Sequence, residues 1–260
     1  RFSRLYPLHF ITLILVLAIQ MVSKNLTGEY QLFDFNDVYH FILNIFFVSG
    51  WGFHNGLNFN QPIWSVSMEL IAYCFFFITL RYIKNFHFKF LIFLYVILML
   101  IDKNFSPPNM NDNILSCLNF FISGAIVYFL MEKIKKKLFI IFSITLLLLT
   151  FIGNFKIFMF CPAVLMIFIS LEETFNKFIN KPIFSMLGNV TYSTYLLHAP
   201  YSIVLILFFK DNIEIYLNPV FFSFYFITLI IGSAIVYIHI EKKLQVKIRQ
   251  KFINVYKKSF

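Results

Sequence analysis

Three clusters of polar residues in this chain have types and spacings that could support chemistry, and the first runs from Asn60 to Tyr73. Ser65, Glu69 and Tyr73 are spaced four residues apart, so they share one face of a helix. A carboxylate within an apolar run is costly unless it is paired or hydrated, which makes Glu69 a candidate functional residue. The alternative is a structural glutamate that joins two helices through hydrogen bonds.

The second cluster runs from Leu187 to Pro200 and places polar groups inside a long apolar run. Its polar side chains recur at the spacing of one helical face: Thr191, Thr194, Tyr195 and His198. Such a stripe must face protein or a water-filled cavity, and Pro200, which lacks an N–H, leaves the carbonyl of Leu196 without a helical partner. His198 is therefore a candidate base, the alternative being a histidine that only packs and hydrogen-bonds.

The third cluster contains two cations, Arg1 and Arg4, three residues apart before the first apolar run. Guanidinium groups match the geometry of phosphates, so these arginines are candidates for binding a phosphorylated cofactor. The alternative is that they only set the topology beside lipid headgroups. The other histidines, which receive no role and show no metal-ligand spacing, are His9, His40, His54, His87 and His239. We expect no metal site.

The elements that must position these clusters are membrane helices. Hydrophobic residues make up 60% of the 260 residues and charged residues 13%, against about 25% charged in soluble domains. The net charge of +10 comes from short clusters of cations between apolar runs, which is typical of loops beside a membrane rather than of a nucleic-acid surface. We therefore predict an all-α, polytopic membrane helix bundle and no nucleic-acid partner.

Eight apolar runs are long enough, or nearly so, to be interpreted as spans. They are Leu5–Val22, Trp64–Ile83, Phe90–Ile101, Ile114–Met131, Leu138–Ile152, Ile157–Leu171, Ile183–Phe209 and Val220–Ile240. A further apolar segment, Val38–Phe53, is short and contains Asn44, Ser49 and Gly50.

The positive-inside rule decides how Val38–Phe53 is interpreted. If this segment does not cross, 18 of the 22 lysines and arginines fall on one side of the membrane. We therefore predict that it is re-entrant on the outside and that both ends of the sequence are cytoplasmic. In this topology Trp64 lies at the outer surface, Glu69 about 7 Å below it, and His198 about 16 Å from the outer end of its helix.

Four motifs in order resemble the landmarks of the acyltransferase-3 family, which comprises bacterial integral-membrane O-acyltransferases, usually with ten spans. The motifs are Arg-Phe-Ser-Arg-Leu-Tyr-Pro from Arg1, Trp-Ser-x-Ser-x-Glu from Trp64 with Tyr73, the segment Leu187–His198, and Ile240-Glu241-Lys242. The resemblance covers nearly the whole chain. Thr191 departs from it mildly, because the family usually has serine there.

The resemblance implies that residues 1–243 form a membrane acyltransferase domain without its first two helices, followed by a basic cytoplasmic tail at 244–260. It implies transfer of acetyl from acetyl-CoA to a hydroxyl of an envelope polysaccharide or lipid-linked glycan, in a multi-pass protein of the bacterial inner membrane that contacts membrane lipid. The family's principal catalytic histidine, eleven residues after an arginine in its first helix, is expected to lie upstream of Arg1.

Our candidate catalytic residues are Glu69 and His198. The resemblance implies supporting work for the residues present, with Glu69 and Tyr73 lining or orienting the active cavity and Tyr192, Tyr195 and His198 on its opposite wall. It implies donor or substrate binding for Arg1, Arg4, Trp64, Ser65, Tyr73, Tyr192 and Tyr195. Glu69 and His198 are expected to meet in one cavity. The rival hypothesis is a transporter or exporter of a small or lipid-linked solute that binds its cargo at the same polar stripe. The sequence shows no internal repeat, which weighs mildly against the transporter.

Overall fold

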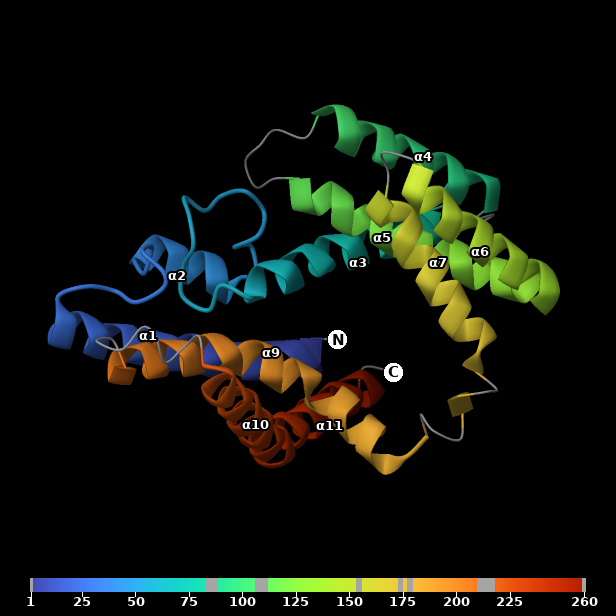
Figure 1. The fold of residues 1–260 in the computed structure, drawn as a ribbon. Helices are drawn as coiled ribbons and strands as arrows, with labels where there is room; N and C mark the ends of the chain where they lie inside the picture. Colours follow the sequence, from blue (N-terminus) through green and yellow to red (C-terminus); the bar gives the residue numbers. More distant parts are fainter. Residues whose placement is uncertain are drawn as a thin grey trace. The chain divides into compact units, whose positions relative to one another are not determined.

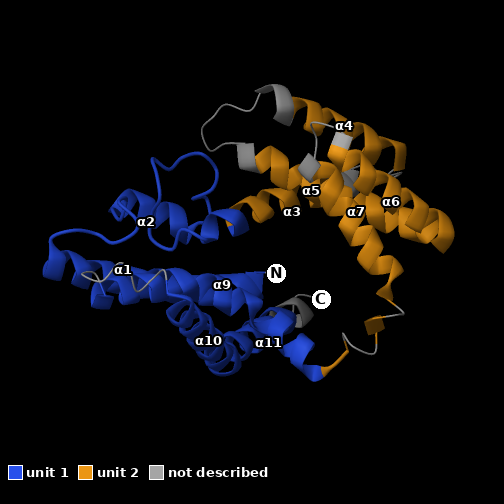
Figure 2. Cartoon of the chain, in the orientation of Figure 1, with its two compact units in different colours: residues 1–66, 182–260 blue, residues 67–181 orange. Residues whose placement is uncertain are grey.

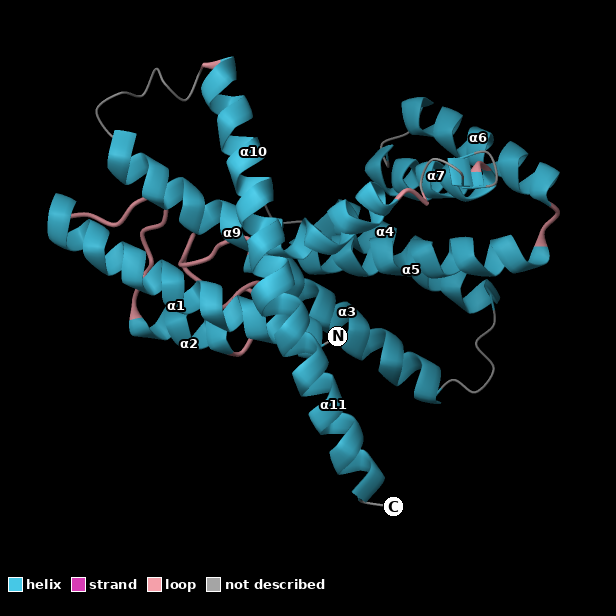
Figure 3. Ribbon diagram, turned by 90° about the horizontal axis from the view of Figure 1, so that it is seen from below, coloured by secondary structure: helices cyan, strands magenta, loops and turns pink. Residues whose placement is uncertain are grey.

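The computed structural model describes residues 2–82, 88–105, 112–152, 156–172, 175–176, 180–209 and 218–258. All regular structure in these residues is helical (Figure 3). The elements (Figure 1) are α1 (Phe2–Thr27), α2 (Val38–Ile45), α3 (Ile63–Tyr82), α4 (Phe88–Phe105), α5 (Asp112–Lys133), α6 (Lys136–Ile152), α7 (Lys156–Ser170), α9 (Pro182–Phe209), α10 (Pro219–Val236), the π-helical turn η2 (Tyr237–Glu241) and α11 (Lys242–Lys258). The all-α prediction is confirmed.

A helix occupies each of the eight apolar runs predicted as spans. Within the described residues, four helices are both long and apolar enough to cross a membrane: Phe2–Thr27, Ile114–Lys133, Pro182–Phe209 and Pro219–Asn254. Three further apolar helices are shorter, at Ile63–Ile78, Phe88–Ile101 and Phe158–Ser170. The chain is thus a helical membrane protein.

The chain divides into two compact units (Figure 2). Unit 1 contains residues 1–66 and 182–260, and unit 2 contains residues 67–181. Each is described by itself. The segment expected to form a basic tail is the helix α11, which continues from α10 through η2 without a break.

In unit 1 the helices α1 and α9 run side by side in the same direction. Tyr192 contacts Leu5 near the starts of both helices, and Ile203 packs with Leu13 and Val16 further along. The helix α10 runs antiparallel to α9, because Ser193 contacts Glu241 and Ser202 contacts Tyr225. These directions are those that the predicted topology requires of the first, seventh and eighth spans.

The segment between α1 and α3 folds against α1 as a dip would. Its helix α2 has only eight residues, too few to cross a membrane. Phe47, just after α2, packs its ring 5.6 Å from Tyr6 and 4.4 Å from His9, between ring centroids. Because α1 ends at Thr27, the segment returns along α1 for about 30 Å by helical rise. Residues 28–62 are called the re-entrant segment for this course, and their placement in a membrane stays a prediction.

The backbone of this segment is strained at buried positions. Phe47 and Phe59 have positive φ angles of 57° and 36°, a region that side chains other than glycine rarely adopt. Both rings are buried in the core of unit 1, which offsets the strain.

The start of α3 lies beside the N-terminal half of α1 and the middle of α9. Asn60 hydrogen-bonds to Thr12 on α1, and Ile63 packs against Leu8 on α1 and Leu196 on α9. The chain therefore passes back along α1 before α3 begins. The depth of about 7 Å expected for Glu69 refers to a membrane surface and stays a prediction.

Unit 2 contains the rest of α3 and the helices α4 to α7, which pack through apolar side chains. Leu91, Leu98 and Ile122 form a buried cluster between α4 and α5. A second cluster joins α5, α6 and α7 through Val127, Phe139 and Met166.

Candidate functional site

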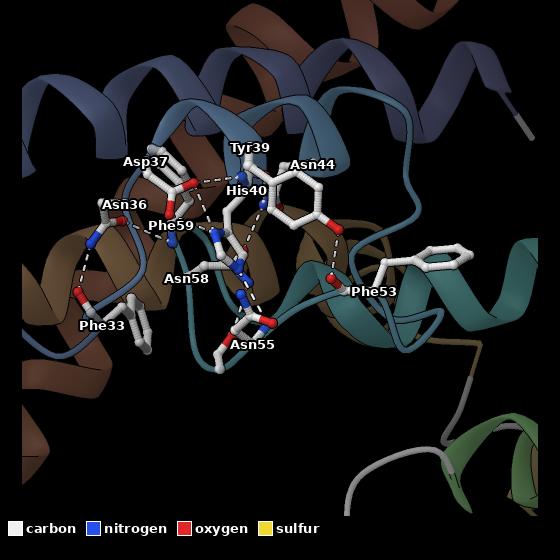
Figure 4. Close-up of polar contacts among 11 residues, drawn as sticks. Phe33, Asn36, Asp37, Tyr39, His40, Asn44, Phe53, Asn55, Asn58 and Phe59 are labelled. Atoms are coloured by element: carbon white, nitrogen blue, oxygen red, sulfur yellow. Dashed lines mark hydrogen bonds and ion pairs between the residues drawn. The ribbon is translucent and has the colours of Figure 1, made fainter.

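The re-entrant segment of unit 1 contains a histidine–aspartate pair (Figure 4). The ring Nδ1 of His40 lies 2.9 Å from both carboxylate oxygens of Asp37, which also caps α2 by accepting from the His40 backbone N–H. That backbone hydrogen bond is the main cause of the lowered pKa of Asp37. The other ring nitrogen, Nε2, accepts from the backbone N–H of Asn55 at 3.2 Å. Because both nitrogens are engaged and the residue is buried, His40 serves structure.

A second buried histidine joins α1 to this segment. The ring Nε2 of His9 donates to the backbone carbonyl of Asn44 at 2.8 Å, since a carbonyl can only accept. The Asn44 side chain in turn donates to the His40 carbonyl at 2.8 Å and to Asn58 Oδ1 at 2.7 Å. The re-entrant segment is therefore fixed to α1 by polar groups that are all shielded from solvent.

Asn60 connects three elements of unit 1. Its Nδ2 donates to Thr12 Oγ1 on α1 at 3.0 Å and to the carbonyl of Leu196 on α9 at 3.1 Å, and the residue itself precedes α3. The Leu196 carbonyl is the one that Pro200 was predicted to leave without a helical partner, so that prediction is confirmed. The proline in α9 thus creates the acceptor that Asn60 uses.

Two of the predicted clusters meet through Ser65 and Tyr195. The Tyr195 hydroxyl donates to the carbonyl of Pro62, so the Ser65 hydroxyl, 2.7 Å away, donates to Tyr195. Trp64, between them in sequence, is half-buried in the first turn of α3. The start of α3 is therefore held against α9 by side chains that sequence motifs had singled out separately.

The predicted polar stripe of α9 lines one pocket. Its four members and Tyr225 of α10 border a space of about 450 Å³ between α9 and α10, with Leu187, Val190, Phe226, Leu229 and Ile230. His198 Nδ1 lies 2.6 Å from the carbonyl of Tyr195, so this nitrogen carries the proton and donates. The lone pair is then on Nε2, for which the structure gives no partner among the residues that it describes. The Tyr195 carbonyl thus fixes the tautomer of His198.

A charged cluster lies near the start of α1. Arg4 Nε is 3.8 Å from Glu241 Oε1, and Ser193 Oγ donates to Glu241 Oε2 at 2.5 Å. Next to it, the Tyr192 hydroxyl donates to the Leu5 carbonyl at 2.6 Å. Tyr192 thus bonds to the backbone of the residue that follows Arg4. Arg1 lies outside the described residues.

Glu69 and Tyr73 belong to unit 2. The Tyr73 hydroxyl donates to Glu69 Oε2 at 2.8 Å, which confirms that the two side chains share a helical face. Glu69 is exposed within its unit. A contact between Glu69 and His198 would be a contact between the two units, and it stays a prediction.

Sequence reasoning missed the roles of His9, His40, Asn44 and Glu241. His9 and His40 received no role because their spacing fits no metal site. Asn44 was noted only as a polar residue of Val38–Phe53, and Glu241 only as part of a motif. A signal was present, since each is a polar residue within or beside an apolar run, where burial requires a partner. The described residues contain no group of three or more His, Cys, Asp or Glu able to hold a metal ion.

Comparison with known proteins adds one match. The acyltransferase-3 family model, described as an acyltransferase domain, matches residues 1–238. No curated protein and no solved structure matches the chain. The matched range contains all the site residues described above except Glu241.

Proposed function

Because the chain belongs to the acyltransferase-3 family, we propose that this membrane acyltransferase transfers acetyl from acetyl-CoA to a hydroxyl of an envelope polysaccharide or lipid-linked glycan. The observation that carries the proposal is the pocket between α9 and α10, where His198 lies beside the hydroxyls of Thr191, Thr194 and Tyr195. A sugar acceptor presents several hydroxyl donors, and the hydroxyls of Thr191 and Thr194, whose own protons bond to the carbonyls of Leu187 and Val190, can accept hydrogen bonds from it.

Among the residues of this sequence, His198 is the candidate for the basic role that the resemblance gives to a histidine upstream of Arg1. With Nδ1–H held by the Tyr195 carbonyl, Nε2 accepts a hydrogen bond from the acceptor hydroxyl. As the hydroxyl oxygen attacks the thioester carbonyl, its proton passes to Nε2. A carbon–oxygen bond forms, the carbon–sulfur bond breaks, and the departing thiolate of coenzyme A takes the proton.

The donor approaches from the cytoplasmic side in this proposal, where Arg1 and Arg4 bind phosphate groups of acetyl-CoA. Partial exposure of the Arg4 side chain supports this, because 36% of its surface is accessible. We assign a catalytic role to Glu69, which accepts a hydrogen bond from the Tyr73 hydroxyl. Donor or acceptor binding is assigned to Trp64, Ser65, Tyr73, Tyr192 and Tyr195.

The topology that we propose has eight spans and the re-entrant segment Val38–Phe53, in the bacterial inner membrane with both sequence ends in the cytoplasm. The asymmetry of the cations supports the sidedness. The parallel course of α1 and α9 and the antiparallel course of α10 support the alternation.

The test measures consumption of labelled acetyl-CoA and label in glycan or lipid, using membranes that contain the protein. His198→Gln should lower turnover by about 10²- to 10⁴-fold, the range of general-base assistance. His239→Gln is the matched control, since His239 is exposed on the neighbouring helix, and it should behave as the native protein.

Two outcomes would contradict the proposal. Movement of a solute across the membrane without consumption of acetyl-CoA would identify a transporter instead. Turnover of His198→Gln within tenfold of native would show that the proton goes to another group.

A further inference from the structure

Glu241 is a buried carboxylate with an incomplete set of partners. Only 2% of the residue is exposed, which makes an unpaired charge costly. Its Oε2 accepts from Ser193, whereas its Oε1 has no hydrogen bond among the residues that the structure describes. Arg4 Nε, at 3.8 Å from Oε1, is too distant for a hydrogen bond and provides the compensating charge.

The π-helical turn η2 is what directs this carboxylate inward. The backbone N–H of Lys242 bonds to the carbonyl of Tyr237, five residues earlier, in place of the usual four. One extra residue in a turn rotates everything after it by roughly 100° about the helix axis. Glu241 thereby faces Ser193 and Arg4, while the adjacent Lys242 is exposed.

Arg4 presents two different edges. Its Nε edge faces Glu241. Neither terminal nitrogen has a partner among the described residues, and the side chain is 36% exposed. The backbone beside it is fixed, because Tyr192 on α9 bonds to the Leu5 carbonyl. A guanidinium held in this way can offer its terminal N–H groups to a phosphate in the bidentate geometry that suits both.

We infer that Glu241 is a positioning residue that orients the Arg4 guanidinium toward the phosphate groups of the coenzyme A donor. This inference rests on the proposed function. Glu241 does not touch the donor and adds no attraction of its own, because its charge has the same sign as phosphate. Glu241 restricts the rotation of the Arg4 side chain. The conformational entropy of that side chain is therefore already reduced before the donor binds.

The experiment compares a donor with phosphates and one without them. Glu241→Gln keeps the size and hydrogen-bonding capacity of the side chain but removes the charge. It should raise the KM for acetyl-CoA about tenfold, a typical loss for one charge-assisted contact, and leave kcat nearly unchanged. The KM for acetyl-pantetheine, which lacks the nucleotide phosphates, should not change. Glu172→Gln is the matched control, because it removes the same charge from an exposed position.

A merely structural glutamate would give a different pattern. Equal loss with both donors, or an unchanged KM for acetyl-CoA in a variant of normal abundance, would overturn the inference. If Glu241→Gln does not accumulate, Ser193→Ala serves in its place, because it frees Oε2 and keeps the charge. It should raise the KM for acetyl-CoA about threefold, as expected for one neutral hydrogen bond.

Direct binding of coenzyme A separates this inference from the proposed function. Native protein that binds coenzyme A but transfers no acetyl would refute the transfer and retain the role of Glu241, tested then by the dissociation constant of coenzyme A. Native protein that does not bind coenzyme A would overturn the inference.

Discussion

Helices of unit 1 are joined by hydrogen bonds between buried polar groups, whereas those of unit 2 pack mainly through apolar and aromatic side chains. In unit 1, Asn60 bridges α1 and α9, and Ser193 bonds to Glu241 across α9 and η2. In unit 2, the hydroxyls of Ser123 and Ser143 bond within their own helices. The bond from Tyr95 on α4 to the Phe158 carbonyl on α7 does cross between helices.

This difference shows that the costly burial of polar groups is concentrated in unit 1. Lipid tails are as apolar as leucine, so close packing is the default way to join membrane helices, and buried polar groups are costly. Their concentration in unit 1 coincides with the pocket at His198 and the charged cluster at Arg4. Asn119 in unit 2 is an exception, because its buried amide has no hydrogen bond among the described residues.

The substitution with the largest expected effect lies in unit 2, at Glu69. A loss of activity there would show that function is not restricted to unit 1. Glu69→Gln should lower acyl transfer by about 10²- to 10⁴-fold, the range of general acid–base assistance, because we assign this carboxylate a catalytic role. Membrane abundance should stay near normal. Labelled acetyl transfer and quantitative immunoblotting measure the two, with Glu172→Gln as the control. Collapse of abundance would instead favour a structural glutamate.

A second prediction sharpens the comparison through two buried asparagines. Asn60→Leu should lower the free energy of unfolding by about 2 to 4 kcal/mol, because it leaves the buried Leu196 carbonyl without a partner and removes a second hydrogen bond, the one to Thr12 Oγ1. Asn119→Leu should be neutral or stabilising, since it removes a buried amide that has no partner in the described chain. Denaturant unfolding in detergent compares them. Equal losses would mean that polar burial works alike in both units.

Two tyrosines give a smaller effect. Tyr195→Phe removes the hydroxyl that connects Ser65 to Pro62. It should lower the free energy of unfolding by about 1 kcal/mol and should also lower acyl-transfer activity. Tyr95→Phe removes one cross-helix bond in unit 2 and should cost a similar free energy with activity retained. Thermal unfolding and the transfer assay distinguish the two variants. Activity lost equally in both would contradict a local role for Tyr195.

The smallest expected effect is a pH dependence confined to unit 1. Burial, followed by the nearby His40, lowers the pKa of His54 from its ordinary 6.5, and the pKa of Asp37 is also lowered. In both cases the unfolded chain binds the proton more readily, so stability is present above the unfolded pKa and is lost as pH falls. Unfolding should therefore become easier below about pH 6.5. His54→Asn should make the free energy of unfolding less dependent on pH just below about pH 6.5. An unchanged slope in that range would contradict the role of His54.

The sequence was sufficient for elements whose cause is local. The apolar run Trp64–Ile83 became α3 at Ile63–Tyr82, and Ile183–Phe209 became α9 at Pro182–Phe209. The unpaired carbonyl of Leu196 also followed from local geometry, because a proline four residues later cannot donate. Helical periodicity likewise placed the stripe containing His198 on one face.

The sequence was insufficient where the partner comes from far along the chain. Asn60 finds Leu196 across 136 residues, and no local pattern specifies that pairing. His9 and His40 received no role because their partners lie in an irregular segment whose course depends on packing against α1. The level along α1 at which α3 begins depends on the same packing.

The division of the chain between the units also has a consequence for its synthesis. Unit 2 is continuous in sequence, so its helices can pack together as soon as they leave the ribosome. Unit 1 is interrupted by unit 2, and α1 must wait for α9. Until then, Asn60 lacks its hydrogen bond to the Leu196 carbonyl. The hydrogen bond of His9 can form earlier, because its partner Asn44 lies in the re-entrant segment. The polar half of the protein is therefore the last to close and the half most exposed to misassembly during biogenesis.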